Sequence, residues 1–304
     1  MKILITGSTG LVGTALLGAL AKDGHTVCRL MRPESEVPGG TKEGFNVAWN
    51  PANGELGGAA VGADAVVNLA GASIAGKRWT AKRKALLRTS RIDTTRALVT
   101  ALAKMNARPS VLVSASAIGI YGNRADELLT EDSKAGSDFL AGLAQDWEAE
   151  ALKAEALGIR VVLARFGIIL AREGGALAKM LLPFKLGIGG RLGSGRQWMS
   201  WVTLEDVVGS LRTALEKNAM KGAVNIVAPG PAPNAAFTKA LADALHRPAI
   251  LPAPAFALRL ALGEMAEALL LSSQRVVPSR LENSGYPFQD RDLPAALRRI
   301  LNPE

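Results

Sequence analysis

The chain has 304 residues, 48% hydrophobic and 21% charged, a balance that excludes disorder and predicts a folded globular protein. Its net charge is +9, and its single cysteine, Cys28, excludes an internal disulfide and a cysteine-based metal cluster. The N-terminus has no signal-peptide pattern, and the most apolar helical segment, 255–271, is interrupted by Arg259, Glu264 and Glu267, so we expect a cytoplasmic protein without a membrane span.

Apolar runs alternate with helical stretches over the first 165 residues. Two runs, DAVVNLA at 64–70 and IRVVLA at 159–164, are continuously apolar, as in strands covered on both faces. This alternation predicts an α/β fold, a Rossmann-like doubly wound parallel sheet with crossover helices. In chain order we expect strands at 2–6, 26–31, 64–70, 110–115 and 159–164, and helices at 11–22, 80–104 and 137–157.

After Arg165 the pattern loosens into glycine-rich loops, and the last third is mostly helical and punctuated by prolines. No internal repeat is visible, and no linker is long enough to separate independent domains. We therefore predict a cofactor-binding domain over 1–165, to which 202–228 returns, and a smaller, mostly helical, substrate-facing lobe over 166–304.

The first thirteen residues, MKILITGSTGLVG, place Gly7, Gly10 and Gly13 between an expected strand and an expected helix. A turn of this kind lets the backbone approach a pyrophosphate and points free N–H groups of the helix at the anion. We expect a dinucleotide here; the alternative is a glycine-rich turn without a ligand. The expected binding residues of this loop are Gly7, Thr9, Gly10, Leu11, Val12 and Gly13.

The end of the second expected strand, CRLMRPE, indicates which dinucleotide is bound. An acidic residue at this place holds the ribose 2′-hydroxyl of NAD, whereas an arginine accommodates the 2′-phosphate of NADP. Arg32 stands at the strand end, and its guanidinium matches phosphate geometry. The sequence therefore predicts NADP(H), with a solvated surface arginine as the alternative.

The basic residues are dispersed except in KRWTAKRKALLRTSR, residues 77–91. A net positive charge suits a polyanion or a phosphorylated ligand. No nucleic-acid-binding module surrounds this stretch, so a nucleic-acid partner is unlikely on these grounds. A ligand role and a solvated helix face both remain open for it.

Several motifs together carry a family resemblance. The glycine loop with its preceding Thr6, VVNLAGAS at 66–73 and SASAIGIYG at 114–122 resemble the extended, epimerase-like branch of the short-chain dehydrogenase/reductase (SDR) superfamily. DFLAGLAQDWEAEA at 138–151, GSGRQWMSWVTLEDV at 193–207 and QRVVPSRLENSGYPF at 274–288 resemble its atypical subgroup of predicted nucleoside-diphosphate-sugar epimerases, sometimes labelled cell-division inhibitors. The resemblance implies that Leu69, Ala70 and Gly71 line the cofactor.

The superfamily's reaction uses a serine or threonine together with a Tyr-x-x-x-Lys pair. The tyrosine transfers the proton, and the lysine lowers the pKa of the tyrosine so that the transfer can occur near neutral pH. The matching helix segment here runs from Phe139 to Leu143, so both members of the pair are missing. Ser116 and Tyr121 are the remaining catalytic candidates, although Ala117 takes the commonest serine position and Tyr121 can equally be a packed aromatic.

In the second half, Arg196, Trp198 and Trp201 follow flexible glycines and are the candidate substrate-binding residues. A structural aromatic cluster is the alternative. Glu148 is expected to cap a helix or form an ion pair. The two histidines form no metal-ligand set, so no metal is expected.

These features favour an NADP(H)-dependent epimerase or reductase acting on an unknown small or nucleotide-linked substrate. The missing tyrosine and lysine favour the alternative, a non-catalytic NADP(H)-dependent sensor or interaction protein. We expect a monomer or homodimer and no membrane partner; a nucleic-acid-binding role ranks third.

Overall fold

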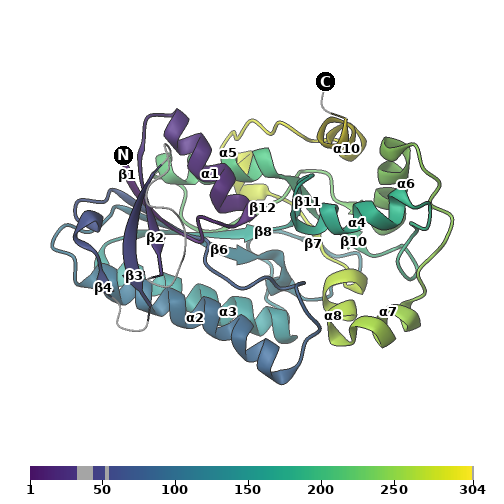
Figure 1. Ribbon diagram of the computed structural model, residues 1–304, viewed down its shortest axis with the longest axis horizontal. Coiled ribbons are helices and arrows are strands. Elements are labelled where there is room, and N and C mark those ends of the chain that lie inside the picture. The colour runs from purple at the N-terminus through teal and green to yellow at the C-terminus, as the bar shows by residue number, and fades with distance from the viewer. Residues whose placement is uncertain (33–43, 52–54, 303–304) are drawn as a thin grey trace.

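An eight-stranded sheet forms the centre of the molecule in the computed structural model, which describes residues 1–32, 44–51 and 55–302 (Figure 1). The strand order is β12-β8-β6-β5-β1-β2-β3-β4, and all neighbours are parallel except β3 and β4. The strands are β1 (Lys2–Thr6), β2 (Thr26–Met31), β3 (Phe45–Asn50), β4 (Glu55–Leu56), β5 (Ala65–Asn68), β6 (Val111–Ala117), β8 (Arg160–Phe166) and β12 (Gly222–Ile226).

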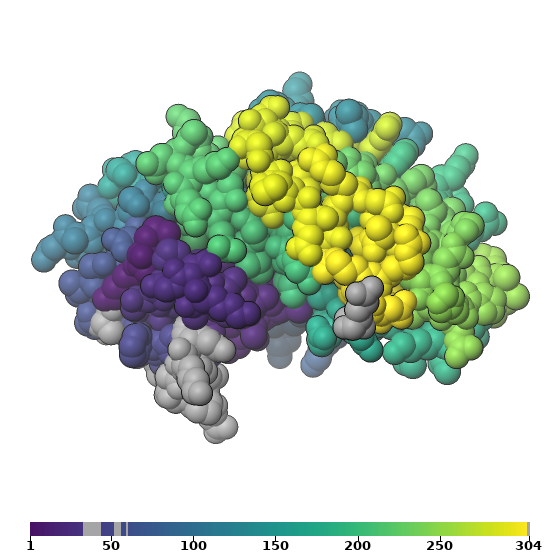
Figure 2. Space-filling model, turned by 90° about the horizontal axis from the view of Figure 1, so that it is seen from above, coloured from purple at the N-terminus to yellow at the C-terminus, as the bar shows by residue number. Residues whose placement is uncertain are grey.

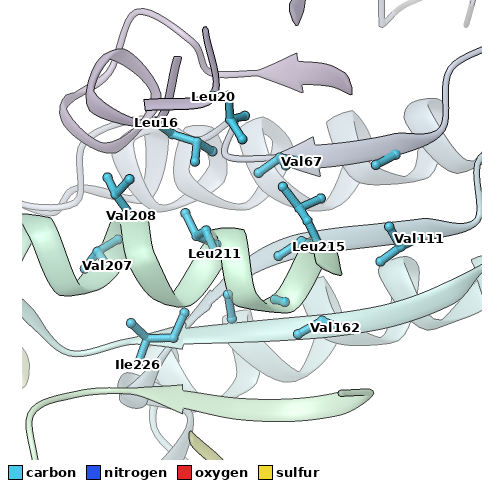
Figure 3. Packing of buried hydrophobic residues seen from close by; sticks show 14 of the residues in the cluster. Leu16, Leu20, Val67, Val111, Val162, Val207, Val208, Leu211, Leu215 and Ile226 are labelled. Atoms are coloured by element: carbon cyan, nitrogen blue, oxygen red, sulfur yellow. The ribbon is translucent and has the colours of Figure 1, made fainter. Parts of the chain in front are cut away.

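Helices cover both faces of this sheet, so the prediction of a doubly wound Rossmann-like fold is confirmed. On one face α1 (Leu11–Lys22) and α5 (Leu204–Glu216) pack against the strands, and Leu16 and Leu211 meet Val67 in a continuous apolar layer (Figure 3). On the other face lie α2 (Ala81–Ala103) and α3 (Phe139–Leu152), with a 3-10 segment at Lys153–Leu157 (Figure 1). Strands buried on both faces explain the continuous apolar runs in the sequence.

The strand order reverses between β1 and β5. The chain passes from β1 outward through β2 and β3, and then crosses to β5 on the other side of β1. In open parallel sheets, ligands bind outside the carboxyl ends of the strands at such a switch point. The loops after β1 and β5 meet there.

Most of the remaining helices form a lobe beyond the carboxyl edge of the sheet. Its core joins α4 and α6 to α10, around Leu177, Phe237 and Leu297. The lobe helices are α4 (Gly175–Lys185), α6 (Asn234–Leu245), α7 (Ala255–Leu262), α8 (Glu264–Ala266) followed by a π-helical turn (Glu267–Leu271), and α10 (Leu293–Leu301). The short helix α9 (Ser279–Asn283) instead packs against β12, with Leu281 in the sheet core. Three short two-stranded sheets lie outside the central sheet. They pair β7 (Leu128–Leu129) with β14 (Arg275–Val276), β9 (Ile168–Leu170) with β11 (Trp201–Thr203), and β10 (Trp198–Met199) with β13 (Ala232–Pro233).

The C-terminal segment returns to the sheet domain and lies across α5 (Figure 2). Asp206, fully buried in the first turn of α5, accepts hydrogen bonds from the Tyr286 hydroxyl (3.1 Å) and the Gln289 amide (2.9 Å). This carboxylate therefore ties the last part of the chain to the sheet. Within the described residues, no helix is long and apolar enough to cross a membrane.

Candidate functional site

The loop between β1 and α1 is shaped by glycines that cannot be replaced without moving backbone. Gly7 has a φ of 68°, and a Cβ atom there would lie 2.6 Å from the carbonyl oxygen of Leu69. A Cβ on Gly13 would lie 2.2 Å from the Gly7 carbonyl oxygen. The two positions therefore bring α1 onto the loop and the loop onto the end of β5, whereas Gly10 faces solvent.

The first turn of α1 is left open to a ligand. Gly10 caps the helix and provides no side-chain hydrogen bond. The amide groups at a helix N-terminus lack intrahelical partners and carry a partial positive charge. Thr9 and Gly10 are exposed and Leu11 and Val12 are half-buried beside them, so this cradle fits a diphosphate.

A chain of buried hydrogen bonds fixes the end of β5 against this loop. The Thr6 hydroxyl donates to Asn68 Oδ1 (2.7 Å) and accepts from the amides of Leu69 and Ala70 (3.1 and 3.2 Å). Asn68 Nδ2 in turn donates to the Thr95 hydroxyl (2.8 Å) on α2. Asn68 and Thr95 escaped the sequence analysis, although an asparagine inside the apolar run VVNLA was a visible signal.

The two arginines of β2 lie in different environments. Arg29 is 5% exposed, and its Nε donates to the Ser8 hydroxyl under the glycine loop (3.4 Å). Arg32 is exposed at the carboxyl end of β2, immediately before residues 33–43, which are outside the described part of the chain. The arginine predicted for the 2′-phosphate is thus the one that faces solvent at the sheet edge.

The two catalytic candidates lie inside the protein, in one hydrogen-bonded network. Ser116 is 2% exposed and its hydroxyl donates to Glu148 Oε1 (2.6 Å). Tyr121 is fully buried; its hydroxyl donates to Asn225 Oδ1 (2.7 Å) and accepts from Arg165 Nη1 (2.9 Å). Structural hydrogen bonds therefore account for both hydroxyl groups.

An ion pair between α3 and β8 forms the centre of that network. Arg165 donates from Nε and Nη2 to the two carboxylate oxygens of Glu148, both at 2.8 Å. Burial lowers the pKa of Arg165, but the Glu148 hydrogen bonds and charge outweigh it and raise that pKa overall. Burial raises the pKa of Tyr121, the opposite of what proton transfer near neutrality requires. The ion-pair role expected for Glu148 is confirmed.

The positions of the missing tyrosine and lysine are filled by an apolar cluster. Leu143 is 3% exposed and packs with Trp79 and Met265, while the rings of Phe139 and Trp79 meet edge to face at 5.3 Å. Met265 belongs to α8, so the C-terminal lobe covers this part of α3. No proton-transferring side chain stands at either of these two positions.

The three predicted substrate-binding residues do not share one surface. Trp201 is fully buried, and its indole donates to the Gly230 carbonyl (2.7 Å). Trp198 is half-buried, donates to Asp126 Oδ1 (2.8 Å) and lies under the Arg275 guanidinium at 4.5 Å. Arg196 is exposed. Packing accounts for Trp201, whereas the other two remain open to a ligand.

Comparison with known proteins places this geometry in a family. Residues 3–227 match the NAD dependent epimerase/dehydratase family, and residues 253–300 match a domain of unknown function (DUF1731). The chain belongs to the NAD dependent epimerase/dehydratase family. The resemblance to extended, epimerase-like short-chain dehydrogenases is thereby confirmed.

Relatives extend this match over the whole chain. An epimerase family protein of Mycobacterium leprae is 42% identical over 296 residues, which are 97% of this chain and 94% of the relative. The crystal structure of human epimerase family protein SDR39U1 (isoform 2) with NADPH is 34% identical, has a TM-score of 0.88 and covers 100% of both chains. The nucleoside-diphosphate sugar epimerase of Corynebacterium glutamicum is 34% identical with a TM-score of 0.80, covering 100% of this chain and 59% of that one.

Proposed function

We propose that the protein binds NADP(H) at the carboxyl edge of the sheet, where the glycine loop meets the end of β5. The observation that carries this proposal is the uncapped N-terminus of α1, held beside the end of β5 by a loop so closely packed that a Cβ on Gly7 or Gly13 would strike backbone atoms. The NADPH in the human relative supports it. The residues that would hold the cofactor are Gly7, Thr9, Gly10, Leu11, Val12, Gly13, Arg32, Leu69, Ala70 and Gly71.

The activity that we propose is hydride transfer of the epimerase or reductase type on a small or nucleotide-linked substrate. A bound nicotinamide would supply or accept the hydride. The chain's contribution is to place the substrate between the sheet edge and the lobe: the backbone before α4 lies against Leu11, with a Cβ on Gly174 only 3.1 Å from Leu11 Cδ1. We assign the cofactor to 1–165 with 202–228 and the substrate mainly to 166–304, in a cytoplasmic monomer or homodimer.

A second function is favoured by one observation. Phe139 and Leu143 pack into an apolar cluster, and Ser116 and Tyr121 are enclosed by structural hydrogen bonds. A protein that keeps the cofactor site but has no tyrosine and lysine at these positions, and whose Ser116 and Tyr121 are enclosed, is suited to binding the cofactor without turnover. In that case NADP(H) would stabilise the fold or regulate a partner without being consumed.

The cofactor assignment is tested by Arg32→Ala, with Arg88→Ala as the matched surface control. Loss of a charge-assisted contact to the 2′-phosphate is expected to weaken the binding of NADPH about tenfold and to leave the binding of NADH unchanged. Calorimetric titration of both nucleotides measures this. Equal losses for the two nucleotides would refute the assignment to Arg32.

The choice between turnover and binding needs a single-turnover experiment. The NADPH-loaded and NADP⁺-loaded protein is mixed with panels of carbonyl compounds and sugar nucleotides while nicotinamide absorbance is followed. A stoichiometric absorbance change supports hydride transfer. An unchanged spectrum across the panels, with a thermal midpoint that rises on adding NADPH, supports the binding function.

A further inference from the structure

The loop after β5 receives cationic side chains from two separate parts of the molecule. From α2, Arg91 Nη2 donates to the Ala72 carbonyl (3.0 Å), and Arg83 donates to the Ser73 carbonyl. From α4, in the lobe, Lys179 Nζ donates to the Ala75 carbonyl (2.6 Å). Arg83, Arg91 and Lys179, which we call the loop cations, thus gather around four residues of backbone.

None of the loop cations has a carboxylate partner among the described residues. Other basic residues of the same helix do: Lys84 pairs with Glu264, and Arg88 pairs with Asp146. Arg83 Nε is buried and makes no hydrogen bond within the described part of the molecule. Within the basic stretch 77–91, Lys84 and Arg88 are therefore paired with carboxylates at the surface, whereas Arg83 and Arg91 contact backbone carbonyls of the loop.

The charge on Arg91 is held in an unfavourable environment. Burial, together with the nearby positive charge of Arg83, lowers the pKa of its guanidinium to about 10. The group also lies over the Trp147 ring, 5.2 Å from its centre. Because an arginine has five N–H donors and the carbonyls of Leu87 and Ala72 engage two of its nitrogens, donors remain for an incoming group.

The loop cations border the proposed active site. A Cβ on Gly71, which is exposed at the end of β5, would lie 3.1 Å from Arg91 Cζ. One helical turn beyond Arg91, Thr95 accepts the hydrogen bond from Asn68 that fixes this strand end. Trp79, which follows the loop, packs beside Phe139 and Leu143. The loop that the loop cations contact therefore runs from the strand end assigned to the cofactor, at Gly71, to the apolar cluster around Trp79 and Leu143.

We propose that Arg83, Arg91 and Lys179 bind an anionic group of the substrate, a phosphate or a carboxylate. The three residues lie on two elements, α2 and α4, so a bound anion would also join the lobe to the sheet domain. This inference rests on the proposed function, which puts NADP(H) on the glycine loop and leaves the loop cations for the second ligand.

The test uses full-length protein saturated with NADP⁺, so that the diphosphate cradle is filled. Inorganic pyrophosphate and citrate serve as probes of the two anion chemistries and are titrated by calorimetry at constant ionic strength. The variants are Arg83→Gln, Arg91→Gln and Lys179→Gln, with Lys84→Gln and Arg88→Gln as matched controls from the same basic stretch. Lys179 is exposed, so its variant is expected to fold even if the arginine variants do not.

We expect the wild type to bind at least one probe and each loop-cation variant to bind it about tenfold more weakly, with the controls within twofold. The affinity for NADP⁺ should stay within twofold in all variants. The proposal is overturned if neither probe binds the wild type, if loop-cation and control variants behave alike, or if the loop-cation variants lose NADP⁺ affinity instead, which would assign them to the cofactor.

Failure of the proposed function gives a different result. If the wild type does not bind NADP⁺, the same titrations are run on the cofactor-free protein. A tenfold loss of probe affinity that is confined to the loop-cation variants still supports the anion site, and equal binding by all variants overturns it.

Discussion

Glu148 and Arg165 are the residues whose pairing the fold depends on most clearly, because their side chains are only 8% and 10% exposed. Glu148→Ala leaves a buried guanidinium without its counter-charge, which costs about 3–5 kcal/mol. Asp146→Ala, two residues earlier, removes the partner of Arg88, whose side chain is 44% exposed, and should cost less than about 1 kcal/mol. Urea unfolding of both variants measures the difference; similar losses would contradict the assignment.

A second residue-level prediction separates two glycines of α1. Gly13→Ala pushes a methyl group against the backbone of Gly7 and Ser8, so we expect a loss of about 1–3 kcal/mol in stability and at least a tenfold loss in NADPH affinity. Gly18→Ala meets no atom within 4 Å and should stabilise the protein by about 0.5–1 kcal/mol. Unfolding curves and NADPH titrations compare the two; unchanged NADPH binding by Gly13→Ala would argue against the cradle.

At the level of single elements, the apolar packing of α3 rules out a simple return to the Tyr-x-x-x-Lys pair. Leu143→Lys would place an ammonium group against Trp79 and Met265, with a penalty on the order of 3–5 kcal/mol for an uncompensated buried charge. Leu143→Met keeps the volume and should cost less than about 1.5 kcal/mol. A Leu143→Lys protein as stable as the wild type in urea would show that this position opens to solvent.

The elements themselves were well predicted from the sequence, because strands buried on both faces give continuous apolar runs and the helices between them are long. The helix expected at 80–104 spans Ala81–Ala103, and the strand expected at 26–31 is found with the same bounds. The direction of side chains in the short lobe strands was not predictable. Trp198 and Trp201 look alike in sequence, yet Trp198 is half-buried and Trp201 lies in the core.

Contacts between distant elements were also beyond reach of the sequence. The glycine loop is local, so its position between an expected strand and an expected helix was enough to predict the cradle. The loop cations instead depend on α4 approaching the loop after β5, which brings Lys179 to a residue 104 positions earlier in the chain. Likewise, Tyr121 looked available for catalysis because the sequence does not reveal that Arg165 and Asn225 enclose its hydroxyl group.

The whole molecule has only two tyrosines, and both are buried in different parts of it. Burial raises the pKa of Tyr121, and burial together with the Asp206 charge raises the pKa of Tyr286. An unfolded phenol ionises near pH 10. The folded state therefore holds these protons more tightly than the unfolded state, and the stability that they contribute is complete below about pH 10 and is lost as the pH rises above it.

It follows that neither tyrosine should ionise in the native protein at pH 10, and that phenolate absorbance should appear together with the loss of circular dichroism as alkali unfolds the chain. Tyr121 belongs to the sheet edge and Tyr286 to the C-terminal segment on α5, so a single coincident transition would report one cooperative unit. Tyr121→Phe should halve the phenolate amplitude. A gradual titration centred near pH 10 with an intact dichroism signal would mean that a tyrosine is open to solvent, and a signal that persists in Tyr121→Phe would identify it as Tyr286.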